Sequence, residues 1–243
     1  MSKTVVLIHG YGFDSRIWSP VELAFEGFRV IYLSLPGFGD ESVDRAYNIA
    51  ELARGFWSEI DPNIAPVVHL VGHSMGGYVC MEMIAQHPER VLSLALIHSH
   101  VFADTEDKKA TRSVAMENIR KNGCQVQAKK MIPSLFDASR FPAELVDMLI
   151  ERGITCGDNA WYFGMGAMRD RKDHGETIQN VSFPVLMIMG ENDTAVPLDL
   201  VYKQAPLVSQ AQLCIYPHVG HMAMYENTAR MICDLVKFYS LIK

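Results

Sequence analysis

The sequence predicts an α/β protein, with a doubly wound and mostly parallel sheet of about six strands and a helical cap inserted after the fourth strand. Short runs of apolar, often β-branched residues recur along the chain, and most are apolar nearly throughout. Strands that are buried on both faces of a parallel sheet have this pattern. Helical patterns separate most of these runs, and this alternation is typical of a doubly wound sheet. Ligands of such sheets bind at the carboxyl ends of the strands.

Six strands and four core helices are expected in chain order. The strands are predicted at residues 4–8, 29–33, 67–71, 92–97, 185–189 and 212–216. The helices are predicted at residues 47–60, 77–87, 198–205 and 227–241.

Residues 99–181 interrupt this alternation because they contain no convincing strand pattern. We interpret them as a helical cap over the active edge of the sheet, with the core formed by residues 1–98 and 182–243. Helices are expected within it at residues 104–121, 125–132, 142–152 and 158–169. Its many Met and aromatic side chains are interpreted mainly as the core of the cap itself. Some should still face the cleft, since such side chains line apolar pockets, and the candidates for substrate binding are Trp161, Met165 and Met168.

Composition excludes several classes of function. The 243 residues carry a formal net charge of −6 and contain no long basic run, which argues against binding to nucleic acid or to an anionic membrane. No stretch reaches the 18 or so apolar residues that a membrane span needs, and no signal segment is visible. The five cysteines are scattered without C-x-x-C spacing, so we expect a reduced, cytoplasmic setting.

The segment from Gly72 to Gly77 predicts a catalytic nucleophile. It reads Gly-His-Ser-Met-Gly-Gly and lies between an apolar strand pattern and a helical one. A tight turn between strand and helix exposes the hydroxyl of a serine at its apex, here Ser74. The glycines at positions 72 and 76 suit such a turn, in which a larger side chain would collide with the neighbouring elements.

A serine nucleophile needs a base and a group that orients the base. Gly220 and His221 follow the last expected strand, and His221 is preferred as the base over His218 because the glycine permits a close-packed loop. Asp193 follows the fifth strand and is the predicted orienting acid, with Glu191 as the alternative. A buried carboxylate bound to the histidine fixes its tautomer and stabilises the imidazolium.

An oxyanion hole is predicted from two backbone amides. The N–H of Met75 comes directly after the nucleophile, and the N–H of Tyr11 lies in the glycine-rich loop after the first strand. Gly10 and Gly12 allow that loop to approach a substrate closely. Losing one such donor typically slows the reaction by about 10²–10³-fold.

Metal and cofactor sites have little support in the sequence. His98 and His100 could share one face at a strand end, but no carboxylate or cysteine cluster accompanies them as zinc sites usually require. No phosphate-binding loop or dinucleotide fingerprint is present. We therefore expect no metal and no cofactor.

Taken together, these motifs give the chain a resemblance to α/β-hydrolase-fold proteins of the capped, lipase- or esterase-like type, along essentially its whole length. The order Ser74, Asp193, His221 is the order of the catalytic residues in that family. The other matching segments are residues 9–12, 35–39, 87–91, Gly190, Pro197 and Gly220. Haloalkane dehalogenases carry aspartate at the elbow, so Ser74 argues against that branch.

The resemblance implies a serine hydrolase that acts on a carboxylic ester of a small or medium, partly apolar molecule. Two alternatives remain open. Relatives with the same triad include carbon–carbon bond hydrolases and enol-lactonases. Other proteins of this fold are ligand sensors or signalling proteins with slow or vestigial hydrolysis, and fold alone does not distinguish them from enzymes.

Overall fold

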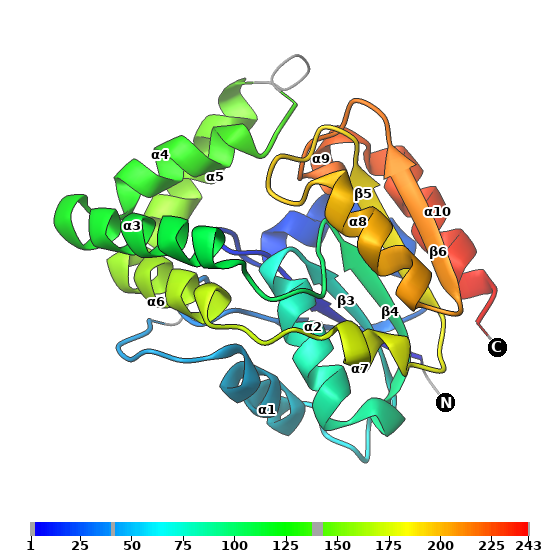
Figure 1. Ribbon diagram of the computed structural model, residues 1–243. Coiled ribbons are helices and arrows are strands. Elements are labelled where there is room, and N and C mark those ends of the chain that lie inside the picture. The colour runs from blue at the N-terminus through cyan, green and yellow to red at the C-terminus, as the bar shows by residue number, and fades with distance from the viewer. Residues whose placement is uncertain (1–2, 40–41, 138–142, 243) are drawn as a thin grey trace.

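A computed structural model describes residues 3–39, 42–137 and 143–242. Its centre is a parallel six-stranded sheet with the strand order β2-β1-β3-β4-β5-β6, covered by helices on both faces (Figure 1). This arrangement confirms the predicted fold class. Within the described residues, no helix is both long and apolar enough to cross a membrane.

The strands occupy the expected positions with shifts of one or two residues at their ends. They are β1 (Thr4–Ile8), β2 (Arg29–Leu33), β3 (Val68–His73), β4 (Val91–Ile97), β5 (Val185–Gly190) and β6 (Ala211–Tyr216). Every residue of β1, β3 and β5 is buried, whereas the edge strands β2 and β6 are partly exposed. The continuous apolar runs that predicted a covered parallel sheet are therefore those of the inner strands.

Helices pack against both faces of the sheet. The core helices are α1 (Ile49–Glu59), α2 (Met75–Gln86), α8 (Leu198–Gln204), α9 (Ala223–Glu226) and α10 (Thr228–Ser240). Short 3₁₀ segments are η1 (Ser15–Phe25), η2 (Pro88–Arg90) and η3 (Ala205–Leu207). In Figure 1, α1, α2 and α8 lie in front of the sheet and α10 lies behind it.

Local sequence explains where these elements begin and why one was missed. The Asn48 side chain accepts a hydrogen bond from the Glu51 N–H, and the Glu51 carboxylate accepts one from the Asn48 N–H, so a reciprocal capping box starts α1. The η1 segment was not predicted. Pro20 lies inside it, and a proline inside a helical pattern normally argues against a helix, although Ile17 and Trp18 are buried in the core.

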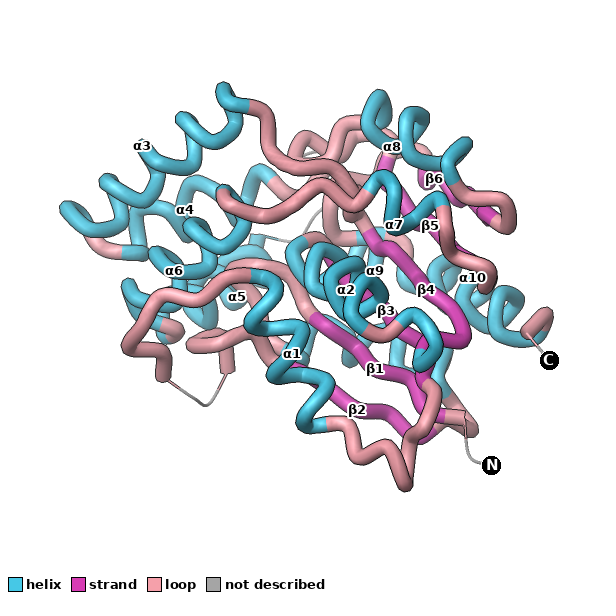
Figure 2. The backbone as a smooth tube through the Cα atoms, turned by 60° about the horizontal axis from the view of Figure 1, so that its bottom comes forward, coloured by secondary structure: helices cyan, strands magenta, loops and turns pink. Residues whose placement is uncertain are grey.

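Between β4 and β5 the described residues form helices and no strand. The helices are α3 (Glu106–Asn122), α4 (Cys124–Ser134), α5 (Ala143–Thr155), α6 (Gly157–Arg169) and α7 (Gly175–Gln179). The predicted helix start at Pro142 lies outside the described residues. Helices α3 to α6 gather beside the end of the sheet at which the strands finish (Figure 2), whereas α7 packs against α2 of the core.

Candidate active site

Ser74 is at the apex of the turn between β3 and α2, in a strained backbone conformation with φ of 50°. Neighbouring backbone leaves no room for side chains beside it. A Cβ on Gly72 would lie 2.5 Å from the Gly77 nitrogen, and one on Gly76 would lie 2.2 Å from the Ile8 carbonyl oxygen. Strain of this kind persists only where the surrounding structure fixes it and is typical of functional sites.

Strand β4 and the loop after it hold the backbone of Ser74. Its N–H donates to the Ile97 carbonyl at 2.9 Å, and the Ser99 hydroxyl donates to the Ser74 carbonyl at 2.8 Å. The rest of the site follows from the parallel sheet, because β1, β4, β5 and β6 all end at the same edge as β3. Segments far apart in the chain therefore meet around this serine.

Asp193, in the loop after β5, is a buried carboxylate that accepts four hydrogen bonds. Oδ2 accepts from His221 Nδ1 at 2.7 Å and from His98 Nδ1 at 3.0 Å. Oδ1 accepts from the backbone N–H groups of Ala195 and Val196 at 2.8 and 2.9 Å. Burial alone would raise the pKa of Asp193, but the charge interactions and hydrogen bonds with the two imidazoles outweigh it and hold that pKa well below its usual range.

His221 borders the same cavity as Ser74. An ionised carboxylate only accepts hydrogen bonds, so the contact with Asp193 places the imidazole proton on Nδ1 and leaves Nε2 as the basic nitrogen. Within the described residues, the Ser74 hydroxyl makes no hydrogen bond to this imidazole. The structure thus brings together three residues from three separate loops.

Close packing fixes the loop that carries His221. A Cβ on Gly220 would lie 2.6 Å from the Leu135 carbonyl oxygen, and that carbonyl accepts the His221 N–H at 2.6 Å. The alternative base, His218, is exposed to solvent. The alternative acid, Glu191, is also exposed and accepts a hydrogen bond from the His218 N–H at 3.4 Å. Neither alternative lies in the hydrogen-bonded group around Asp193.

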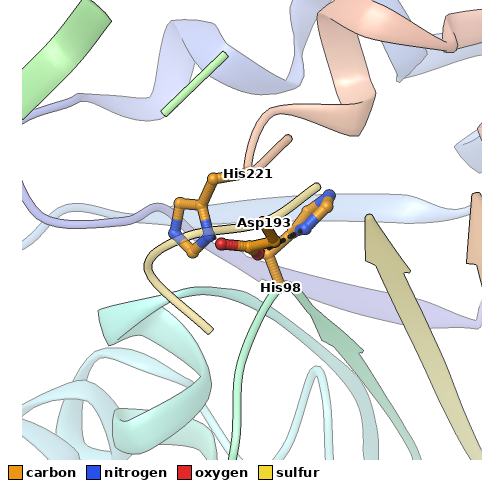
Figure 3. A group of neighbouring side chains, drawn as sticks. All are labelled: His98, Asp193 and His221. Carbon is orange, nitrogen blue, oxygen red and sulfur yellow. Dashed lines mark hydrogen bonds and ion pairs between the residues drawn. The ribbon is translucent and has the colours of Figure 1, made fainter. Parts of the chain in front are cut away.

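His98 is a member of this group that the sequence did not identify as part of the triad's surroundings (Figure 3). Its Nε2 accepts the Ala223 N–H at 3.2 Å, so its proton is on Nδ1 and is donated to Asp193. Burial lowers the pKa of His98 against the attraction of the carboxylate. The one available signal was its position directly after β4, at the same edge as the other site residues.

Together, His98, Asp193 and His221 place possible metal-ligand atoms within 4.8 Å of one another. Their hydrogen bonds are those of a hydrogen-bonded group and not of a metal site. Both imidazoles donate to the carboxylate, and His98 Nε2 accepts a backbone N–H. The sequence-based pairing of His98 with His100 does not occur either. His100 lies 3.5 Å from the Tyr78 hydroxyl and 3.4 Å from Arg171 Nη2, away from Asp193.

The two amides predicted for the oxyanion hole are available as donors. Within the described residues, no acceptor takes a hydrogen bond from the N–H of Tyr11 or of Met75. The ring of Tyr11 serves packing instead, since its hydroxyl donates to the Trp161 carbonyl at 2.6 Å. Met75 begins α2, so its amide also benefits from the positive end of the helix dipole.

A cavity of about 640 Å³ opens above Ser74 between the edge of the sheet and helices α3, α4 and α6. Met165 and Met168 line it, as do Tyr11 and Met131. Trp161 is not among the described residues that line it. The Trp161 indole is fully buried, donates its N–H to the Gly153 carbonyl at 2.7 Å and packs edge-on against Tyr11, so the structure places it behind the cavity wall.

Fold and site together define a hydrolase-type centre, and comparison with known proteins gives the family. Residues 3–228 match the family model described as alpha/beta hydrolase fold, so the chain belongs to this family. It is 27% identical over 254 residues to a 2-hydroxy-6-oxononadienedioate/2-hydroxy-6-oxononatrienedioate hydrolase of Paraburkholderia phymatum, with 97% of this chain and 86% of that protein covered.

Another relative is larger. The chain is 28% identical over 234 residues, 93% of its length, to the dihydrolipoyllysine-residue acetyltransferase component of the acetoin cleaving system of Cupriavidus necator, and spans only 60% of that protein.

Solved structures show the same fold. A thermophilic esterase from Thermogutta terrifontis has a TM-score of 0.90 and 23% identity, with 99% of this chain and 90% of that chain covered. The enol-lactonase from Burkholderia xenovorans LB400 has a TM-score of 0.89 and 20% identity, with 99% and 92% covered.

Proposed function

We propose that this protein is a serine hydrolase that cleaves carboxylic esters through an acyl-enzyme on Ser74. The observation that carries the proposal is the 2.7 Å hydrogen bond between His221 Nδ1 and Asp193 Oδ2, at a cavity that the strained Ser74 also borders. A nucleophile, a base with a fixed tautomer and a buried orienting carboxylate are the three parts that acyl transfer by serine requires.

In the proposed reaction, the Ser74 hydroxyl oxygen attacks the ester carbonyl carbon while His221 Nε2 takes the hydroxyl proton. The carbonyl oxygen becomes an oxyanion that the Tyr11 and Met75 amides bind. The tetrahedral intermediate collapses, the bond to the alcohol oxygen breaks, and His221 gives its proton to the departing alcohol. Water then attacks the acyl-enzyme with His221 again as base, which releases the acid and restores Ser74.

Asp193 keeps its negative charge throughout this cycle. It is ionised at neutral pH because its pKa is held low, and it stabilises the imidazolium that forms on His221. We propose no metal or organic cofactor in the reaction, and a small-molecule ester as the substrate.

A fluorophosphonate probe tests the proposed nucleophile, since it reacts with an activated serine hydroxyl. The probe should add to Ser74 of the intact protein, as seen by peptide mass spectrometry, and Ser74→Ala should stay unlabelled. A screen of p-nitrophenyl esters of increasing acyl length, with Ser74→Ala as the blank, should then show multiple turnovers. Folded protein that is neither labelled nor active would refute the proposal. Slow single turnover combined with ligand-induced stabilisation would favour a sensor instead.

The names of the relatives support carbon–carbon bond hydrolysis as a second candidate. A 2-hydroxy-6-oxo-dienedioate contains a ketone and no ester, so its hydrolysis must break a carbon–carbon bond. The same three side chains could serve such a reaction. Turnover of a vinylogous diketone or an enol-lactone far above that of p-nitrophenyl esters would favour this candidate.

A further inference from the structure

The cap wall of the cavity carries positive charge without a matching negative charge. Lys108 and Arg112 on α3, and Lys130 on α4, line the cavity, and no Asp or Glu of the described residues does. The core wall by contrast is largely apolar or aromatic, with Tyr11 and Phe13 among its residues. The cavity therefore has one side suited to an apolar group and another suited to an anion.

Arg112 is the central residue of the charged wall. Its side chain is only 12% exposed, and its Nε donates to the Asp104 carboxylate. Nη1 contacts only the thioether sulfurs of Met165 and Met168, both at 3.5 Å, and thioethers are weak acceptors. Within the described residues, no oxygen accepts a hydrogen bond from Nη1 or Nη2. Arg112 lines the cavity, so a ligand there could supply the oxygen acceptor that these two groups lack.

Asp104 does not neutralise the wall. Its other oxygen pairs with Arg171 Nη1 at 2.7 Å, so one carboxylate is shared between two guanidinium groups. Arg171 is otherwise satisfied, since it donates to the carbonyls of Phe102 and Met168. His100 adds no negative charge and is itself neutral, because burial and the nearby Arg171 lower its pKa to about 3.

Lys108 lies one helical turn before Arg112 and forms no ion pair with any described residue. Burial lowers the pKa of Lys108, and Arg112 lowers it further, against the opposite effect of Asp104. The positive charge of this wall therefore extends along α3 beside the cavity.

From this arrangement we infer that the cap wall binds a carboxylate carried by the substrate, with Arg112 as its main ligand and Lys108 beside it. The two free Nη groups of a guanidinium form a planar pair of donors that matches the two oxygens of a carboxylate. This inference deepens the proposed function and rests on it: the substrate would be an ester with an apolar part at the core wall and a free carboxylate at the cap.

Matched ester pairs test the inference. One pair is p-nitrophenyl hydrogen glutarate and p-nitrophenyl methyl glutarate, which differ only by the methyl group that removes the charge. A second pair carries the carboxylate on the alcohol side: the butyrate ester of glycolic acid and its methyl ester. In at least one pair, kcat/KM of the wild type should favour the charged ester by about tenfold or more, since hydrogen bonds to charged groups are the strong ones. The preference should weaken as salt is added.

Arg112→Met should reduce the charged-to-neutral ratio by about tenfold, mainly through KM, because a contact far from the reacting bond binds ground and transition states alike. Lys108→Met should reduce this ratio by a smaller factor. It provides a second test of the inference if Arg112→Met folds poorly. Lys129→Met is the matched control, since Lys129 is exposed on α4 and does not line the cavity; its ratio should equal that of the wild type.

The inference would be overturned if, in both pairs, kcat/KM of the wild type for the charged ester were equal to or lower than that for the neutral ester, and if neither Arg112→Met nor Lys108→Met changed this ratio. Preference for the butyrate ester of 2-hydroxyethyl phosphate over both carboxylates would also overturn it, in favour of a phosphate ligand. The proposed function is judged separately. Hydrolysis of the neutral methyl esters by the wild type, but not by Ser74→Ala, supports ester hydrolysis whatever the ratio. If the wild type hydrolyses none of these esters, both the proposed function and the inferred carboxylate site are refuted.

Discussion

Replacing His98 with alanine should slow catalysis although His98 does not touch the substrate. The change removes the donor that lies 3.0 Å from Asp193 Oδ2, and the buried carboxylate keeps its bonds from His221, Ala195 and Val196. A hydrogen bond to a charged group contributes about 1.5–3 kcal/mol, so complete loss in the transition state would cost roughly 10- to 150-fold in rate. Because three donors remain, we expect kcat/KM to fall by about tenfold.

The separate effects on kcat and KM distinguish this role from simple packing. With His98 present, two imidazoles donate to one carboxylate oxygen. Without His98 the carboxylate loses one of the two side-chain donors that orient it against His221, so kcat should fall while KM changes little.

His98→Asn provides the matched control. An asparagine amide can place an N–H donor where Nδ1 was, and asparagine tolerates the positive φ of 49° at this position. We expect its kcat within about threefold of the wild type. The assay is p-nitrophenyl ester hydrolysis at pH 7 over a range of substrate concentrations, so that kcat and KM are obtained separately. A His98→Asn enzyme as slow as His98→Ala, or a loss confined to KM, would refute a role through Asp193.

Stability should respond to pH through the same carboxylate. The pKa of Asp193 is lower in the folded protein than the value of about 3.9 in an unfolded chain. Its contribution to the free energy of unfolding is therefore fully present above about pH 4 and is lost as the pH falls toward the folded pKa. Urea unfolding should show His98→Ala less stable than the wild type at pH 7, with a smaller difference at pH 3.

Further predictions concern the acid, the elbow and the cap. Asp193→Asn should lower kcat by about 10⁴-fold in ester hydrolysis with little change in circular dichroism, because a neutral amide neither fixes the His221 tautomer nor stabilises the imidazolium. Gly76→Ala should lower the free energy of unfolding by at least about 3 kcal/mol in urea titrations, since its Cβ would meet the Ile8 carbonyl oxygen at 2.2 Å. Trp161→Phe should lower stability by about 1 kcal/mol through loss of the bond to Gly153, while the relative kcat/KM values across a series of acyl chain lengths stay unchanged.

Much of the fold could be predicted because its signals are local. Apolar runs mark strands that are covered on both faces, and the glycines around Ser74 mark a turn in which the backbone leaves no room for a side chain. The elements η1, α7 and α9 were not predicted. α7 and α9 have five and four residues, which are too few for a periodic pattern, and α7 is positioned by its packing on α2. η1 has 11 residues, but it contains Pro20, a residue that normally argues against a helix.

The sequence could predict the residues of the candidate site that directly follow a strand, because their position follows from the order of the strands. Ser74, Asp193 and His221 each follow a strand, and parallel strands end at one edge, so their meeting was foreseeable. His98 also follows a strand, but its donation to Asp193 depends on the orientation of its ring and on the Ala223 amide that fixes its tautomer. The positions of Arg112 and Lys108 on the cavity wall depend on which face of α3 turns toward the sheet, and the sequence does not determine how α3 packs there.

Helix α4 and the proposed base, His221, are directly connected. The Leu135 carbonyl directly after α4 accepts the His221 N–H at 2.6 Å, while Lys130 and Met131 of the same helix line the cavity. The helix that lines the cavity is therefore directly followed by the residue that holds the backbone of His221. A ligand that displaces α4 would shift His221 relative to Ser74, and a reaction of this kind is sensitive to displacements of about 1 Å. Substitutions of the cavity-lining residues Lys130 and Met131 on α4 should consequently change kcat as well as KM, whereas substitution of Arg112 on the cavity-lining face of α3 should act mainly on KM.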